Sequence, residues 1–228
     1  MSGFLKSSIG KKLIMSVTGV FLVVFLLFHV SMNIVVLIST DAYNAICAFL
    51  GANWYALAGT LLLACGFAIH IIYSLLLTLS NRKARGNNRY AVSVTPKNVS
   101  WASQNMLIIG IIVILGLFLH CTQFWYKMQF AEIMGNHQSS LGNQMIDAHN
   151  GAEFIKYYFS KALIVVVYMI WLAALWFHIS HGFWSALQSV GWSNQTWLPR
   201  LKCAAKIFAT LICIGFAAVV VAFYFKSL

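Results

Sequence analysis

The stretch LIMSVTGVFLVVFLLFHVSMNIVVLI, residues 13–38, contains no Asp, Glu, Lys or Arg and a single histidine, His29. A helix needs about 20 predominantly apolar residues to cross the hydrocarbon core of a bilayer, so this stretch is long enough. Four more apolar runs follow, separated by polar connections. The sequence therefore predicts an all-α integral membrane bundle, one domain over residues 1–228, with five transmembrane helices at approximately Leu13–Ile38, Trp54–Leu79, Met106–Trp125, Ala162–Leu187 and Ala204–Phe225.

The composition also favours a membrane protein. Hydrophobic residues make up 61% of the chain and charged residues only 8%, whereas soluble domains contain about 25% charged residues. The first run lacks a small-residue cleavage site and is interpreted as a retained helix. None of the cysteines forms a C-x-x-C pair, which argues against a zinc site, a cysteine-ligated iron–sulfur cluster and covalently attached haem. Pro96 and Pro199 are expected in connections.

Lys and Arg residues predict the orientation. With five spans, one side receives eleven of them: Lys6, Lys11, Lys12, Arg82, Lys83, Arg85, Arg89, Lys97, Arg200, Lys202 and Lys206. The other side receives four, together with all four acids: Lys127, Lys156, Lys161, Lys226, Asp41, Glu132, Asp147 and Glu153. The positive-inside rule then predicts a cytoplasmic N-terminus and an outside C-terminus. A nucleic-acid partner is not expected, because no groove-reading motif accompanies the net charge of +11. Membrane lipid is an expected partner, since the basic side could bind anionic headgroups or an acidic protein surface.

Five of the seven histidines lie inside the apolar runs, where ionisable residues are costly and usually functional. His29, His70 and His120 lie in the first three runs, and His178 and His181 share the fourth. Counted at about 1.5 Å per residue, His29 and His120 lie about 10–18 Å below the outer boundary, and His70 and His178 about 25 Å below it. Two layers of two imidazoles are what two bis-histidine haems require, because neutral imidazole is a good iron ligand.

The neighbouring residues are compatible with this interpretation. Gly66, Gly116 and Ala174 each lie one helical turn before a proposed ligand, where a small residue lets a flat porphyrin approach, although Phe25 takes this position in the first helix. His181 lies three residues after His178, so the two cannot both be axial ligands of one haem. A packed or hydrogen-bonding role is favoured for it, ahead of a metal, haem-propionate or quinone contact. The remaining histidines, His137 and His149, are expected to be solvated loop residues.

Five motifs give the chain a resemblance to a known family. They are KLIMSVTG (Lys12–Gly19), LLFHVSMN (Leu26–Asn33), AIHIIY (Ala68–Tyr73), GLFLH (Gly116–His120) and WFHISHGFWSALQSVG (Trp176–Gly191). From Lys11 to about Phe225 the chain resembles the diheme cytochrome b subunit of succinate:quinone oxidoreductases, the menaquinone-linked succinate dehydrogenases and fumarate reductases. The last motif is the most specific of the five.

The resemblance implies ligands, partners and a location. It makes His29 and His120 the iron ligands of an outer, distal b-type haem, and His70 and His178 those of an inner, proximal one. It implies a bacterial cytoplasmic membrane, with an FAD-containing flavoprotein subunit and an iron–sulfur subunit on the cytoplasmic face. The membrane substrate would be a quinone, menaquinone for this class, exchanging near the outer haem. The dicarboxylate chemistry would belong to the partners, since this chain has no Gly-rich dinucleotide fingerprint and no cluster cysteines.

The quinone site and the docking surface are less well defined by the sequence. Quinone chemistry moves protons as well as electrons, so an acid near the outer site would be useful. Asp41, with Tyr43 and Asn44, is the candidate for this site, and a solvated loop is the alternative for the same residues. Tyr73, Gln123 and Trp125 are weaker candidates. None of the five expected transmembrane helices contains Asp or Glu, which argues against a built-in transmembrane proton path. The basic inner edge is a candidate docking surface for the iron–sulfur subunit, although the positive-inside rule explains the same residues: Arg82, Lys83, Arg85 and Arg89.

Two other functions use histidines in membrane helices. The chain could be the cytochrome b anchor of another quinone-linked dehydrogenase or of a hydrogenase, which a co-purifying flavoprotein subunit of the succinate dehydrogenase type would argue against. It could also be a transporter that carries metal ions or protons, but transporters usually contain inverted repeats and broken helices, and neither is evident here. A haem spectrum separates the transporter from both cytochromes.

Overall fold

The computed structural model describes residues 3, 7–85, 100–192 and 194–228, and most of these are helical. Within this part of the chain, five helical segments are long and apolar enough to cross a membrane, which confirms the prediction of five spans. They are α2 (Ser8–Ile38), α4 (Trp54–Arg85), α6 (Met106–His120) with the π-helical turn η1 (Cys121–Trp125), α9 (Ala162–Ser189) and α10 (Trp197–Phe225).

Several helices extend beyond the expected bounds. Helix α2 begins at Ser8, whereas the expected span began at Leu13. Ser7 caps this earlier start, because its side chain accepts a hydrogen bond of 3.0 Å from the backbone N–H of Gly10. The expectation that Pro199 lies in a connection is wrong, because α10 begins at Trp197. Proline is tolerated in a first helical turn, where its missing N–H would have had no helical partner. Other residues named above lie outside the described residues: Lys6, Arg89, Pro96 and Lys97.

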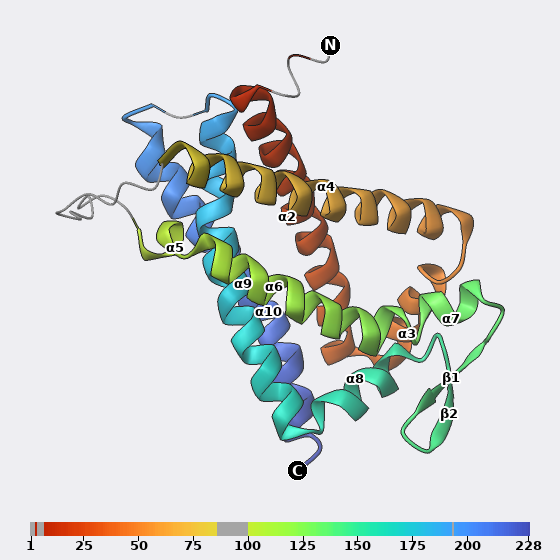
Figure 1. Ribbon diagram of the computed structural model, residues 1–228. Helices are drawn as coiled ribbons and strands as arrows, with labels where there is room; N and C mark the ends of the chain where they lie inside the picture. Colours follow the sequence, from red (N-terminus) through yellow and green to blue (C-terminus); the bar gives the residue numbers. More distant parts are fainter. Residues whose placement is uncertain (1–2, 4–6, 86–99, 193) are drawn as a thin grey trace.

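The long helices pack around α9. Figure 1 shows α9 and α10 side by side, and α2 also packs against both. The remaining two spans have one main partner each: α4 crosses α2 at a steep angle, and α6 packs along α9. Many side chains on these helices are exposed although they are apolar, including Ile38 at 83% and Leu163 at 74%. Apolar side chains directed outward are what a lipid environment requires, since lipid tails are as apolar as leucine.

Short elements gather at the end of the bundle where α2 ends and α9 begins. They are α3 (Thr40–Phe49), α7 (Gln129–Ile133), the antiparallel strands β1 (Gln138–Leu141) and β2 (Gln144–Asp147), and α8 (Gly151–Phe159). At the other end of the bundle, α5 (Trp101–Gln104) precedes α6. The hairpin is a difference from the expected all-helical fold. Its two-residue turn begins at Gly142 with φ +64°, a conformation that glycine adopts without steric cost.

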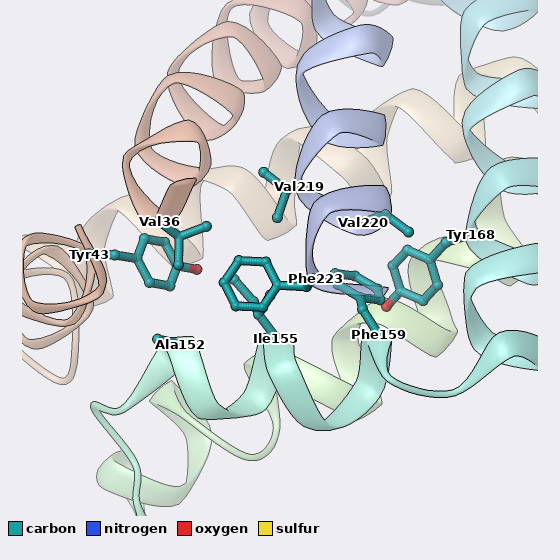
Figure 2. Packing of buried hydrophobic residues seen from close by; sticks show 9 residues of the cluster. All are labelled: Val36, Tyr43, Ala152, Ile155, Phe159, Tyr168, Val219, Val220 and Phe223. Atoms are coloured by element: carbon teal, nitrogen blue, oxygen red, sulfur yellow. The ribbon is translucent and has the colours of Figure 1, made fainter. Parts of the chain in front are cut away.

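A buried apolar cluster holds α8 against the ends of three long helices. Figure 2 shows Ile155 and Phe159 of α8 directed toward Val219 and Phe223 of α10. The full cluster draws on α2, α3, α8, α9 and α10 and comprises Val36, Tyr43, Ala152, Ile155, Phe159, Tyr168, Val219, Val220 and Phe223. The connection between α6 and α9 is therefore a folded cap on the bundle. Its packing contacts the ends of α2 and α9, which carry His29 and His178.

Candidate functional site

The four histidines proposed as ligands lie in two pairs. The rings of His29 and His120 have centroids 5.8 Å apart and planes at 81°. Those of His70 and His178 have centroids 6.2 Å apart and planes at 65°. Metal–imidazole bonds are about 2 Å long, so two rings on opposite sides of one metal have centroids about 6 Å apart. Each pair draws on two helices, α2 with α6 and α4 with α9, and has the spacing for one shared metal centre.

Aromatic rings surround the outer pair. Phe25, the residue that departs from the small-residue pattern, stacks on His29 with centroids 5.3 Å apart and planes at 16°. Phe216 of α10 lies 5.5 Å from the same ring. His120 contacts Phe124 at 5.1 Å and Trp171 of α9 at 5.8 Å. Because these rings come from α2, α6, α9, α10 and η1, five segments together surround the outer pair, whose two histidines are half-buried.

A hydroxyl group of α2 contacts the ring of His70 in the inner pair and bears on which ring nitrogen carries the proton. Oγ1 of Thr18 donates its only proton to the carbonyl oxygen of Ile14, at 2.8 Å, and the same Oγ1 lies 3.2 Å from Nδ1 of His70. Helix carbonyl oxygens within reach of this hydroxyl favour the assignment in which Oγ1 accepts from His70 and Nδ1 carries the ring proton. Nε2 of His70 then keeps a free lone pair. This is the arrangement that orients a metal-binding imidazole.

Asn33 approaches His29 in a different way. Its Nδ2 donates to the backbone carbonyl oxygen of His29 at 2.8 Å, and the 3.5 Å separation from the ring Nδ1 is too long to fix a tautomer. Its Oδ1 accepts a hydrogen bond of 3.2 Å from the hydroxyl of Tyr43. Burial raises the pKa of Tyr43 well above its usual value, so the phenol remains a donor. Tyr43 therefore fixes the helical turn that carries His29.

The two pairs occupy different levels of the bundle. Along α2, Thr18 contacts the inner pair and His29 belongs to the outer pair, a separation of about 16 Å at 1.5 Å per residue. Along α6, Gly110 lies against the inner pair, because a Cβ added to it would lie 3.9 Å from Cε1 of His178. His120 follows it by ten residues, about 15 Å. Two helices thus give similar separations between the levels.

The donor set fits two axially ligated haems. Each pair contains one buried nitrogen without a hydrogen-bond partner, Nδ1 of His120 or Nδ1 of His178, and these are the only such side-chain atoms in the described residues. An unsatisfied buried polar atom marks a strained or functional position or an additional ligand. No group of three or more His, Cys, Asp or Glu that could hold a metal ion occurs in the part of the chain the structure describes. A haem needs only two axial protein ligands, so the pairs are sufficient.

The glycines before the proposed ligands lie against flat rings. A Cβ on Gly66 would lie 2.6 Å from Cε1 of Phe21, and a Cβ on Gly116 would overlap the ring of Trp171. Nε1 of that tryptophan donates to the carbonyl oxygen of Val113 at 3.0 Å. These glycines therefore admit planar groups close to the backbone, and in this structure the groups are protein side chains.

The outer quinone-site candidates have different surroundings. Asp41 is exposed in the first turn of α3, where a negative charge is stabilised by the helix N-terminus. Asn44 fastens α3 to α8, because its Nδ2 donates to Oδ1 of Asn150 and its Oδ1 accepts from the N–H of Ala152, both at 3.0 Å. The side-chain amide of Asn44 is thus engaged in a tertiary contact, and the structure does not bring it together with Asp41 into one site.

The weaker quinone-site candidates and His181 lie in different parts of the bundle. Gln123 is buried in the π-helical turn after His120, and its Oε1 accepts a hydrogen bond of 2.8 Å from the hydroxyl of Tyr168. Trp125, in the same turn, donates to Oε1 of Gln129 at 2.9 Å. The π-helical turn shifts the register directly after a proposed ligand, and such turns often mark functional sites. Tyr73 is half-buried on α4, and His181 contacts the edge of Trp184 at 5.1 Å.

A hydrogen-bonded network of Glu132, His149 and Asp147 in the cap was not predicted from the sequence. Oε2 of Glu132, whose side chain is 6% exposed, lies 3.1 Å from Nε2 of His149. It also accepts a hydrogen bond of 2.9 Å from the N–H of Ala52. Nδ1 of His149 lies 3.1 Å from Oδ1 of Asp147, and the N–H of His149 holds the pKa of that carboxyl below its usual value. The only signal in the sequence was the concentration of acids and histidines in one connection.

The basic inner edge is described in part. Arg82 and Lys83 are exposed at the C-terminal end of α4, which ends at Arg85.

Comparison of the chain with protein families, with curated proteins and with solved structures gives no match. Conclusions about function therefore rest on the residues of this chain.

Proposed function

We propose that the chain is the membrane-anchoring, diheme electron-transfer subunit of a succinate dehydrogenase or fumarate reductase complex. In this role it passes electrons between a membrane quinone, menaquinone in our proposal, and the iron–sulfur subunit of the complex. The observation that carries the proposal is the arrangement of four histidines from four membrane helices in two pairs, with ring centroids 5.8 and 6.2 Å apart.

The residues of the chain hold and orient the ligands. Thr18 keeps the ring proton of His70 on Nδ1, so that Nε2 is free to bind iron. Phe25 packs on His29 and Trp171 on His120, which orients both rings of the outer pair. A b-type haem with two imidazole ligands supplies one-electron redox chemistry without an open iron position.

The surrounding assembly is part of the same proposal. The basic inner ends of the helices face the bacterial cytoplasm and bind the iron–sulfur subunit, which connects to the FAD-containing flavoprotein. The C-terminus lies outside, and quinone exchanges near the outer pair. Charge supports this orientation, since all four acids fall on the side opposite the basic edge.

A haem count with a reduced-minus-oxidised spectrum tests the proposal on the purified chain with any co-purifying subunits. We expect about two b haems per chain, both low-spin because both iron faces are ligated. His70→Ala and His178→Ala should each remove the inner haem, and His29→Ala and His120→Ala the outer one. His137→Ala, in the cap, is the matched control and should keep both haems. Absence of haem from folded protein would refute the proposal.

Partner subunits decide between this complex and other quinone-linked enzymes. We expect a flavoprotein with covalently bound FAD and an iron–sulfur protein to co-purify with the chain, and succinate to reduce the haems of that complex. A diheme chain that purifies with hydrogenase or formate dehydrogenase subunits would instead support the alternative cytochrome b anchor.

A further inference from the structure

An apolar groove runs between α9 and α10 on the outer surface of the bundle. It encloses about 320 Å³ and is lined by Met169, Ala173 and Trp176 of α9 and by Thr210, Ile214 and Ala217 of α10. Ile214 is 63% exposed and Met169 38% exposed, so the groove opens to the surroundings of the bundle. The groove contains no proposed haem ligand and plays no part in the function proposed above.

A hydrogen bond joins α9 and α10 at the inner end of the apolar lining. Nε1 of Trp176 donates to Oγ1 of Thr210 at 2.9 Å, which joins the two helices at that level. Beyond this bond the lining remains on one face of α10, because Lys206 lies one turn before Thr210 and Lys202 one turn before Lys206. By this helical spacing, the two lysines continue the lining face of α10 past the inner end of the groove.

The lysine end of the groove also bridges both helices. Nζ of Lys202 lies 4.8 Å from the ring centroid of Trp184 on α9, and the guanidinium of Arg200 lies 5.1 Å from the ring of Trp197. Lysine, arginine and tryptophan together are typical of the headgroup level of a membrane. These residues also belong to the basic side of the chain, which the positive-inside rule assigns to the cytoplasm.

The dimensions of this strip match one leaflet. Lys206 and Ala217 are separated by eleven residues, about 16 Å at 1.5 Å per residue, and half of the hydrocarbon core measures about 15 Å. A second groove, lined by Phe28, Met32, Ala45 and Phe49 among others, has a similar volume of about 340 Å³. No basic residue lines it, and the nearest charged residue in sequence is Asp41, so it offers no anionic headgroup site.

We propose that the α9–α10 groove binds one anionic phospholipid of the inner leaflet. An acyl chain lies between Trp176 and Ala217 and fills the apolar lining, and the phosphate lies beside Lys202 and Lys206. Charge complementarity selects an anionic lipid over a zwitterionic one, since each lysine near a membrane surface attracts anionic lipid.

Native mass spectrometry of the full chain, titrated with phosphatidylglycerol or with phosphatidylcholine of the same acyl chains, tests the proposal. We expect a single phosphatidylglycerol adduct, bound about thirtyfold more tightly than phosphatidylcholine. This ratio of affinities follows from the attraction of an anionic headgroup to two lysines. The double variant K202Q/K206Q should lose this preference. K11Q/K12Q removes the same charge from the same side of the chain and should retain it.

A second pair of variants tests the groove. Ala217→Trp fills it and should abolish the adduct, whereas Ala45→Trp fills the α2–α3 groove and should leave the adduct unchanged. Equal binding of the two lipids by the unmodified chain, or a preference that survives K202Q/K206Q, would overturn the proposal. The proposal would also be overturned if Ala217→Trp keeps the lipid adduct but dissociates a dimer of the unmodified chain. In that case the occupant of the groove would be a second copy of this chain.

Discussion

Thr18→Val tests the reasoning about ring orientation at the inner pair. Valine has nearly the shape of threonine but lacks the oxygen that lies 3.2 Å from Nδ1 of His70. Without this acceptor, the ring proton is free to move to Nε2, which must be unprotonated to bind iron. Loss of a hydrogen-bond partner of a metal ligand typically costs 10- to 100-fold in metal affinity, about 1.4–2.7 kcal/mol. We expect that loss at the inner haem and none at the outer one.

The assay is a haem titration of the haem-free chain, followed by absorbance, with the inner site isolated by the His29→Ala substitution. Thr18→Ser keeps the hydroxyl and should restore the affinity. Thr122→Val is the matched control, because its Oγ1 donates to the carbonyl oxygen of Leu119 at 2.8 Å and contacts no proposed ligand. If Thr18→Val binds haem at the inner site as tightly as the parent chain, the hydroxyl does not set the ring state and the argument is refuted.

Three further predictions concern folding and pH. Gly116→Ala should lower the free energy of unfolding by about 1–3 kcal/mol in detergent, because the new Cβ meets the Trp171 ring, whereas Gly59→Ala meets no neighbour and should be neutral or stabilising. Glu132→Ala should destabilise the cap by about 1–3 kcal/mol, because the N–H of Ala52 and Nε2 of His149 both lose their partner. The surface control Glu153→Ala should change the stability of the cap by less than about 1 kcal/mol. The pKa of Asp147 is lowered mainly by the N–H of His149, so its contribution is present above about pH 4 and lost as the pH falls through its lowered pKa. Amide exchange at His149, corrected for intrinsic rates, should therefore rise in acid, and Asp147→Asn should remove this dependence.

The sequence predicted the features that depend on local composition. Five apolar runs indicated five spanning helices because the bilayer sets a minimum length, whatever the packing between helices. Counting residues from the outer ends also placed His29 with His120 and His70 with His178 by depth, and the structure brings the same residues close together. The depth argument works because helices have a fixed rise, so position in sequence gives position along the axis. The orientation and the haems remain predictions.

The features that the sequence did not reveal depend on contacts between distant residues. Glu132 meets Ala52, eighty positions away, and no local pattern indicates which loop a carboxylate will reach. Asn44 was selected for its position beside the first helix, but its amide is held by residues more than one hundred positions later. The hairpin did have a local signal, the Gly142–Asn143 turn between two short polar runs. It was overlooked because polar strands lack the hydrophobic alternation that usually identifies a strand.

The polar atoms of the membrane helices show why the histidine pairs are exceptional. Hydroxyl groups in α2 satisfy themselves locally: Ser16 donates to the carbonyl oxygen of Lys12 and Ser31 to that of Leu27, each at 2.8 Å. His120 and His178 differ, because each leaves Nδ1 buried without a partner, one in each pair. An unsatisfied buried polar group costs about 1–3 kcal/mol, and lipid offers no water to offset that cost. Leucine at these two positions would avoid the cost, which distinguishes the two imidazoles from the hydroxyl groups of α2.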